Sequence, residues 1–151
     1  TGEESKTVDI ATILETVSDQ LVDTGHDVVL AGLPHLSLRC KPLAIKRAFS
    51  NLIENAVKYG ARARVALAER DDGIVITIAD DGPGVPEEEL ERVFDPFYRL
   101  EASRSRETGG TGLGLTVART VIRAHGGDVR LHNLQSSGLC ATVTLPKTID
   151  L

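Results

Sequence analysis

Cysteines and aromatic residues are scarce in this chain. Its 151 residues include two cysteines, three phenylalanines and two tyrosines, and they include no tryptophan or methionine. Cys40 and Cys140 lie far apart, and neither belongs to a CxxC or Cys/His ligand spacing. Metal binding through thiolates is therefore not supported, and we expect two buried thiols in a reducing cytoplasm.

Long hydrophobic runs and an excess of positive charge are also missing. The longest apolar runs, at residues 28–33 and 74–79, are far shorter than the roughly 20 residues that span a bilayer, and no signal peptide opens the sequence. A formal net charge of −5 disfavours a general nucleic-acid binder, because that function needs a basic face. Length and composition therefore predict one soluble globular domain without direct contact with nucleic acid or a membrane.

The hydrophobic pattern predicts helices interleaved with antiparallel hairpins. Residues 1–7 are small and polar and are predicted to be a tail. The predicted helices cover about 10–25, 42–59 and 112–125, and the predicted strands cover 28–31, 36–40, 64–69, 74–80, 129–132 and 141–145. This order predicts an α+β fold, a two-layer α/β sandwich with about three helices on one face of a mixed, largely antiparallel sheet.

The second predicted helix carries an unusual polar face. At about 100° per residue, Asn51, Asn55 and Lys58 gather on the side opposite the apolar residues. Solvated surface is the simplest interpretation of such a stripe. Asparagine, however, destabilises a helix interior relative to Ala, Lys or Glu, so a face that only meets water would not favour two of them. An amide oxygen is a hard ligand suited to Mg²⁺, and Lys58 can meet a phosphate.

Two glycine-rich segments lie at the ends of predicted elements. Residues 80–84 (DDGPG) place a carboxylate at the end of a β-branched strand, where an ordinary turn is the simpler interpretation. Residues 109–115 (GGTGLGL) open the last predicted helix, and such an entry presents backbone N–H groups to an anion such as phosphate. Neither segment matches the Walker A motif or the dinucleotide-binding GxGxxG motif.

Four segments therefore stand in a fixed order along the chain: residues 51–59 (NLIENAVKY), 80–84 (DDGPG), 94–99 (FDPFYR) and 110–115 (GTGLGL). They resemble the N, G1, F and G2 boxes of sensor histidine kinases. The resemblance covers nearly the whole chain and implies the Bergerat-type ATP-binding sandwich shared with gyrase, Hsp90 and MutL, here over residues 8–151. Residues 42–60 look especially like the osmosensor type of these kinases.

The resemblance implies a role for each matching residue. Asn55, supported by Asn51, would hold Mg²⁺, and Lys58 would contact a phosphate of ATP. Asp80 would accept a hydrogen bond from the adenine amino group. The other nucleotide contacts would come from Tyr59, Gly82, Gly84, Gly110, Thr111, Gly112, Leu113 and Gly114.

The segment between the two glycine-rich motifs would complete the catalytic set. Arg99 would lie near the γ-phosphate and act with Asn55 and Lys58. Residues 101–109 would form a mobile lid ordered by the nucleotide. Phe94 and Phe97 would form a docking surface or latch for the domain that carries the substrate histidine, with core packing as the alternative.

This predicted kinase domain lacks its acceptor. In the family the acceptor histidine lies on a separate helical hairpin and precedes an acidic residue, and none of the four histidines has that context. His125, before two glycines at a helix end, is expected to cap the helix or to lie on the surface. The implied partners are a histidine-bearing dimerisation domain of the same protein and a downstream response regulator, and the full-length protein would be anchored in the inner membrane.

Two other functions stay open within the same fold. One is a degenerate regulatory domain that binds nucleotide or a partner kinase without transfer, and the other is an anti-sigma-type serine kinase. Residues 94–99 favour the histidine kinase over the serine kinase, and the complete set of metal, adenine and lid residues favours transfer. Direct ATP hydrolysis should be poor, because Asn51 stands where gyrase-like members carry a water-activating glutamate, and Glu54 points about 100° away from Asn55 around the helix.

Overall fold

The structure is a computed structural model that describes residues 2–96 and 114–147. The helical elements are α1 (Ile10–Asp23), α2 (Pro42–Gly60), the 3₁₀ turns η1 (Glu87–Glu89) and η2 (Arg92–Phe94), and α4 (Gly114–Ala124). The strands are β1 (Lys6–Asp9), β2 (Asp27–Leu30), β3 (Ser37–Cys40), β4 (Arg62–Arg70), β5 (Gly73–Asp80), β6 (Asp128–Asn133) and β7 (Leu139–Pro146).

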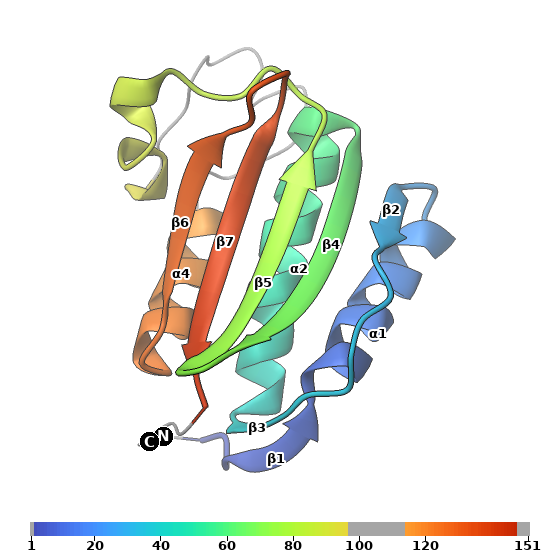
Figure 1. The fold of residues 1–151 in the computed structure, drawn as a ribbon, viewed down its shortest axis with the longest axis vertical. Coiled ribbons are helices and arrows are strands. Elements are labelled where there is room, and N and C mark those ends of the chain that lie inside the picture. Colours follow the sequence, from blue (N-terminus) through green and yellow to red (C-terminus); the bar gives the residue numbers. More distant parts are fainter. Residues whose placement is uncertain (1, 97–113, 148–151) are drawn as a thin grey trace.

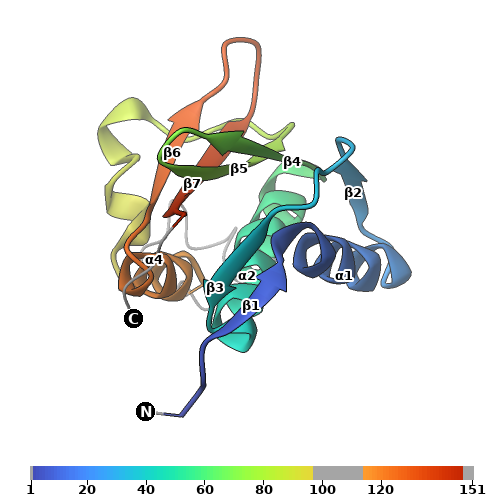
Figure 2. The same ribbon diagram turned by 60° about the horizontal axis from the view of Figure 1, so that its bottom comes forward.

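Five strands form the main sheet, in the order β2-β4-β5-β7-β6. β2 runs parallel to β4, and the other neighbouring pairs are antiparallel. The α-helices of the described part, α1, α2 and α4, lie together on one face of this sheet (Figures 1 and 2). The predicted α+β two-layer sandwich with a mixed, largely antiparallel sheet is confirmed.

The core lies between the sheet and the helices, because each of these layers contributes one apolar face. Val65 of β4 and Ile76 of β5 are fully buried, and less buried residues alternate with such positions in the middle of both strands. Ile45, Phe49 and Ile53 form the apolar stripe of α2 and are also fully buried. Burial of this stripe sets the rotation of α2 about its axis and therefore the direction of its polar face.

The N-terminal residues differ from the prediction. The sequence places Lys6 and Thr7 in a tail, but both belong to β1, which pairs antiparallel with β3 in a separate small sheet. Pairing with a distant strand overrides a local sequence that carries no clear strand pattern. Asp9 then caps α1, because its Oδ1 accepts a hydrogen bond from the Ala11 N–H at 3.2 Å.

His125 has a structural role in the interior. Of the two expected roles, contact with the helix end is the one present, and the surface position does not apply because the residue is only 2 % exposed. Its Nδ1 lies 2.8 Å from the Val121 carbonyl, and its Nε2 accepts a hydrogen bond from the Lys41 N–H at 3.1 Å. A neutral ring that carries its proton on Nδ1 satisfies both bonds. His125 thereby joins the end of α4 to the residue before α2.

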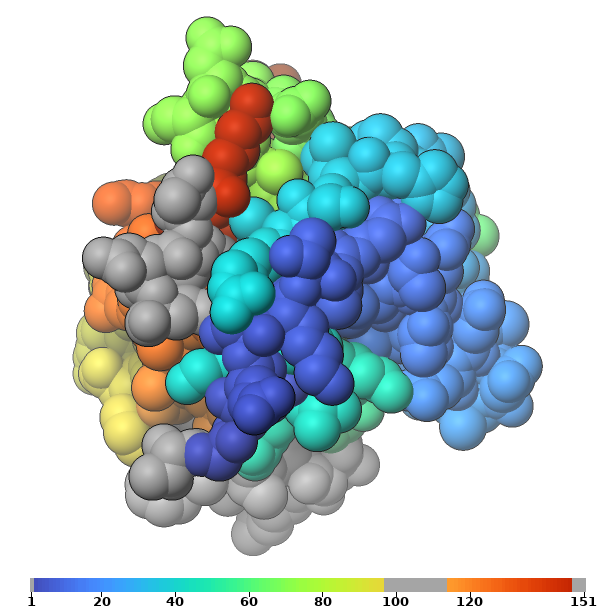
Figure 3. Space-filling view, turned by 90° about the horizontal axis from the view of Figure 1, so that it is seen from below, coloured from blue at the N-terminus to red at the C-terminus, as the bar shows by residue number. Residues whose placement is uncertain are grey.

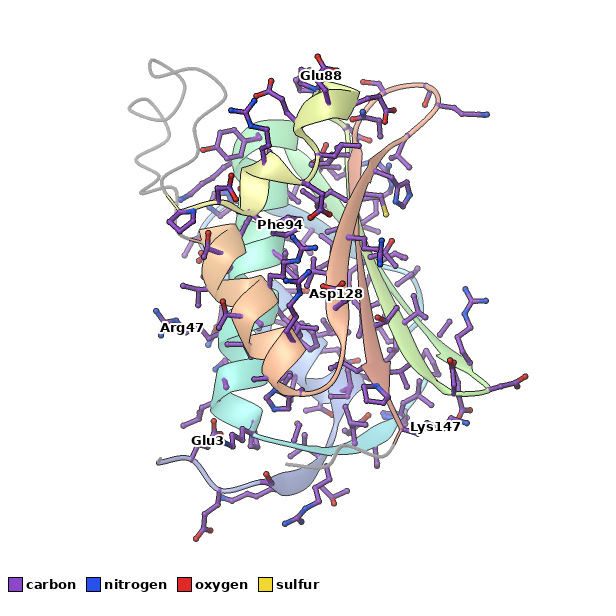
Figure 4. All side chains as sticks on the ribbon, turned by 90° about the vertical axis from the view of Figure 1, so that its left-hand side faces the viewer. Glu3, Arg47, Glu88, Phe94, Asp128 and Lys147 are labelled. Carbon is purple, nitrogen blue, oxygen red and sulfur yellow. The ribbon has the colours of Figure 1, made fainter. Side chains whose placement is uncertain are left out.

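The first turn of α2 is capped by a residue far away in the sequence. Lys41, at the N-cap position, makes no side-chain capping bond. The Glu3 carboxylate instead accepts hydrogen bonds from the backbone N–H groups of Leu43 (2.5 Å) and Ala44 (3.0 Å). Figure 4 labels Glu3 beside this turn, and Figure 3 shows the N-terminal segment packed over the same region. A negative charge there also interacts favourably with the helix dipole.

Cys40 and Cys140 are free and buried, as predicted. Burial raises the pKa of the Cys40 thiol to about 11, so this group stays protonated at neutral pH. Within residues 2–96 and 114–147, no helix has the length and apolar character needed to cross a membrane.

Removal of the distant cap should destabilise the domain. We expect Glu3→Ala to lower the free energy of unfolding by about 1 kcal/mol, because two N–H groups at the start of α2 lose a charged acceptor. The matched control is Glu4→Ala, which changes an exposed neighbour that makes no hydrogen bond in the described part and should stay within about 0.5 kcal/mol of the parent. Urea unfolding would measure both variants, and equal midpoints would contradict the capping role.

Candidate functional site

The polar face of α2 forms one end of the candidate site. Asn51 and Asn55 are half-buried, and Lys58 is exposed. Neither amide takes part in a hydrogen bond with the residues that the structure describes, although both lie in the interior of a helix. The two amides are therefore not used to hold the helix in place, and their oxygens remain available to a ligand.

Asp80, the last residue of β5, forms the other end. Its side chain lies against Gly60, the last residue of α2, and a methyl group at Gly60 would overlap it. Asn55 precedes Gly60 by five residues, or about 7.5 Å along the helix axis. Asp80 therefore packs against the C-terminal end of the same helix whose middle carries the amide face.

Glycines surround Asp80 because the backbone comes too close for side chains. A Cβ at Gly82 would lie 2.6 Å from the Tyr59 carbonyl oxygen, and a Cβ at Gly138 would overlap the Asp80 carbonyl. These contacts bring together the end of α2, the turn after β5 and the loop between β6 and β7. The predicted residues Tyr59, Gly82 and Asp80 are thus adjacent in space, and Gly138, which the sequence did not single out, belongs with them.

The Asp80 carboxylate is held by backbone donors. It is 5 % exposed, and its Oδ1 accepts hydrogen bonds from Gly82 N–H (2.9 Å) and Leu139 N–H (3.1 Å). Burial raises the pKa of Asp80, and these two hydrogen bonds oppose that rise. Among the described residues no donor reaches Oδ2. That oxygen can therefore accept a hydrogen bond from a bound molecule.

The turn after β5 is fastened to the β6–β7 hairpin by residues that the sequence did not single out. Asn133 accepts a hydrogen bond from the Val85 N–H (2.9 Å) and donates one to the Val85 carbonyl (2.7 Å), and the Ser137 hydroxyl donates to the Gly82 carbonyl (2.8 Å). Gly84 has a φ of +79°, and a Cβ there would lie 2.5 Å from the Asn133 Oδ1. An asparagine at the end of a strand predicts only a turn, so the local sequence gives no indication that Asn133 contacts Val85.

The start of α4 approaches the amide face of α2. A Cβ placed on Gly114 would lie 3.9 Å from the Asn51 Cβ. The last glycine of the second glycine-rich segment is therefore next to the polar stripe, as a shared anion site requires. The predicted residues Arg99, Phe97, Gly110, Thr111, Gly112 and Leu113 and the predicted lid at 101–109 lie outside the described residues.

Phe94 is part of the packed interior. It is 6 % exposed, and the Arg119 guanidinium lies 4.0 Å from the centre of its ring. Its backbone carbonyl accepts a hydrogen bond from the Thr116 hydroxyl at 2.6 Å. The docking role predicted for Phe94 is therefore corrected to the alternative, core packing, because a buried ring offers no surface to a partner.

The donor chemistry of the amide end fits a magnesium ion that brings its own phosphate ligands. Within the described part no three His, Cys, Asp or Glu residues gather as a metal site. Mg²⁺ typically takes one or two protein oxygens and completes its shell with phosphates and water. The free amides of Asn51 and Asn55 match that modest requirement. Lys58 also lines a cavity of about 310 Å³ between α1 and α2, which does not include Asp80.

Comparisons with known proteins find similarity over most of the chain. A family model described as histidine kinase-, DNA gyrase B- and HSP90-like ATPase matches residues 40–149. Sensor histidine kinase GtrS of Pseudomonas aeruginosa is 39% identical over 145 residues, which are 96% of this chain and 30% of GtrS. Sensor histidine kinase CpxA of Escherichia coli is 43% identical over 106 residues, which are 70% of this chain and 23% of CpxA. The chain thus spans less than a third of the length of either relative.

A solved structure shows the same fold. The crystal structure of the ATP binding domain of PrrB from Mycobacterium tuberculosis superposes with a TM-score of 0.80 at 27% sequence identity. The similarity covers 97% of this chain and 99% of the PrrB domain.

Replacement of the buried carboxylate should stabilise the domain at neutral pH. Burial raises the pKa of Asp80 in the folded state above its ordinary value of 3.8. At pH values between the two, the folded chain therefore binds more protons than the unfolded chain. The free energy of unfolding falls as pH rises through the folded pKa. Asn in place of Asp keeps an oxygen for the Gly82 and Leu139 N–H groups and does not titrate. We expect Asp80→Asn to gain stability relative to the parent as pH increases from 4 to 8, measured by urea unfolding. A difference that is independent of pH would show that the carboxylate is not penalised by burial.

Proposed function

The chain belongs to the family of histidine kinase-, DNA gyrase B- and HSP90-like ATPases, and we propose that it binds Mg·ATP and donates the γ-phosphoryl group to a histidine on a separate domain. It would be the catalytic domain of a two-component sensor histidine kinase. The observation that carries this proposal is that α2 bears two asparagine amides without a hydrogen-bond partner among the described residues and ends at Gly60, against which the buried Asp80 carboxylate packs. Similarity to GtrS and CpxA supports the kinase function.

Asp80 would recognise adenine. Its Oδ1 is occupied by two backbone N–H groups, so Oδ2 is the oxygen that would accept the hydrogen bond from the exocyclic amino group. Gly82 and Gly84 would let the base approach the backbone, and Tyr59 would lie beside it. A carboxylate offers only acceptors, so it would meet the guanine carbonyl with acceptor against acceptor.

The amide face of α2 would serve the phosphates. Asn55, with Asn51 beside it, would hold Mg²⁺, which would neutralise phosphate charge when bound. Lys58 would contact a phosphate as a point charge. Gly114 at the start of α4 would contribute to the anion site, because the N-terminus of a helix presents unpaired N–H groups.

Transfer in such a domain depends on positioning rather than on covalent chemistry by the protein. Arg99 would act near the γ-phosphate with Asn55 and Lys58, and Gly110, Thr111, Gly112 and Leu113 would close on the nucleotide with the segment 101–109. Attack by water would be slow, because Asn51 replaces the activating glutamate of gyrase-like members.

The acceptor would come from another part of the protein. His125 is buried with both ring nitrogens engaged, and the other three histidines lie before β2, before β3 and within β6, not on a helical hairpin (His26, His35 and His132). The partner would therefore be a histidine-bearing dimerisation domain, followed by a response regulator. The parts of the protein that correspond to the remainder of GtrS, of which this chain covers 30%, would carry that domain and an anchor in the inner membrane.

Asn55→Ala should weaken Mg·ATP binding at least tenfold while the domain stays folded, because the residue faces away from the core and Ala favours a helix. Calorimetry with Mg·ATP and with ATP in EDTA would measure the effect, and the loss should appear only with the metal. Ser50→Ala is the matched control, since it also shortens a half-buried polar side chain of α2. Unfolding of Asn55→Ala would make the residue structural instead.

The same variant tests transfer. The parent chain, mixed with the histidine-bearing domain of its own protein and ATP labelled in the γ-phosphate, should yield a labelled product that is labile in acid. Asn55→Ala should yield none. An acid-stable product would indicate a serine kinase, and nucleotide binding without product would indicate a regulatory domain.

Asp80 should determine base specificity. ATP should bind far more tightly than GTP, and Asp80→Asn should lose about 1–3 kcal/mol of ATP affinity, because a donor replaces one acceptor oxygen in a buried hydrogen bond. Titration of parent and variant with both nucleotides would measure this. If the parent bound GTP equally well, the assignment of Asp80 to the base would be wrong.

A further inference from the structure

A nearly buried arginine of α4 joins this helix to η2, to the residue before η2 and to β6. The Arg119 side chain on α4 is only 11% exposed. Its NH1 and NH2 lie 3.0 and 3.3 Å from the two carboxylate oxygens of Glu91, and its Nε lies 3.3 Å from Asp128 Oδ1 at the start of β6. The guanidinium also stacks 4.0 Å from the centre of the Phe94 ring of η2. Figure 4 labels Phe94 and Asp128 on the side of the domain that carries α4.

A second side chain of α4 holds the same residue of η2. Thr116 lies three residues before Arg119, on the same face of the helix. Its hydroxyl donates a 2.6 Å hydrogen bond to the Phe94 carbonyl. Phe94 is therefore held through both its backbone and its ring, and its position relative to the first turns of α4 is determined by these two contacts.

Stability alone does not explain a charge at this position. Desolvation of a guanidinium is unfavourable, and apolar residues of similar size often replace buried ion pairs without loss of stability. A planar guanidinium, however, can pair with carboxylates along its edge while an aromatic ring packs on its face. Arg119 pairs with Glu91 and Asp128 along its edge and packs on Phe94 with its face. It thereby fixes the positions of η2, α4 and β6 relative to one another.

The part of α4 that Arg119 and Thr116 hold is close to the proposed phosphate end of the site. Gly114, two residues before Thr116, is next to Asn51 on the amide face of α2. The adenine end is built differently, from Asp80, Gly60 and the β6–β7 loop. The side-chain hydrogen bonds of Arg119 and Thr116 go instead to Glu91, Asp128 and Phe94. A change at Arg119 should therefore affect one end of the site and spare the other.

We propose that Arg119 and Thr116 are positioning residues that hold η2 and the first turn of α4 in the arrangement that binds the terminal phosphate of the nucleotide. This inference rests on the proposed function, because it assumes that the amide face of α2 and the start of α4 receive phosphates. Neither residue touches the nucleotide. Both act through the placement of Phe94 relative to Gly114.

The test compares two nucleotides on the whole 151-residue chain. Arg119→Met keeps the length of the side chain and removes the charge, Thr116→Val removes the hydroxyl, and Glu91→Gln weakens the pair from a side chain that is 70% exposed. The dissociation constants of Mg·ATP and Mg·ADP are measured by calorimetry. We expect the ATP affinity to fall at least fivefold in Arg119→Met and Thr116→Val, and less in Glu91→Gln, while the ADP affinity changes less than twofold.

The controls lie one turn further along α4. Arg123→Met removes an arginine that bonds to Asp128 but not to Glu91 or Phe94, and Thr120→Val removes a hydroxyl that bonds within the helix to the Thr116 carbonyl. Both controls should leave the ratio of the two dissociation constants unchanged. Simple destabilisation cannot mimic the expected result, because partial unfolding weakens ATP and ADP binding by the same factor.

An unchanged ratio in Thr116→Val and Glu91→Gln would overturn the proposal, even if Arg119→Met did not fold. An equal change of the ratio in Arg123→Met or Thr120→Val would also overturn it, because the effect would then belong to α4 as a whole. Failure of the parent chain to bind either nucleotide would refute the proposed function itself, which makes the two failures distinguishable.

Discussion

The candidate site depends on one constraint, the close packing of backbone around the buried carboxylate of Asp80. Asp80 is 5 % exposed, and burial of a negative charge is unfavourable unless nearby dipoles compensate for the lost water. Two backbone N–H groups, from Gly82 and Leu139, provide part of that compensation. They can approach only because Gly60, Gly82 and Gly138 have no side chains, since a Cβ at any of the three would collide with the backbone or with Asp80. The end of α2, the turn after β5 and the β6–β7 loop therefore form one unit, in which a single added methyl group would displace the carboxylate.

The helices that carry the site are held at their ends by residues that are distant in sequence. The first turn of α2 depends on the Glu3 carboxylate and on His125, and Thr116 near the start of α4 is tied to η2. Free N–H groups at a helix start need acceptors, and for α2 these acceptors come from other segments. The position of the amide face is therefore a property of the whole domain and not of α2 alone.

Strong periodicity made some elements predictable from the sequence. The sequence predicts α2 and both hairpins correctly, because apolar residues recur at helical spacing between Pro42 and Gly60 and alternate along β4, β5, β6 and β7. The strand character of Lys6 and Thr7 was missed, because it depends on pairing with β3. The burial of His125 and Phe94 was not decided by the sequence for the same reason, since their partners lie far away along the chain.

The sequence by itself determined the chemical groups of the site: a carboxylate at a strand end, two amides and an ammonium on one helix face, and glycines where the chain turns. These are local properties, set by residue type and by the spacing of residues within one element. Only the tertiary structure decided which groups meet. Asn133 holds Val85 across 48 positions, Leu139 reaches Asp80 across 59 and Lys41 reaches His125 across 84. Contacts of this kind arise from packing of the sheet against the helices, and no local pattern encodes them, because each partner looks ordinary in its own segment.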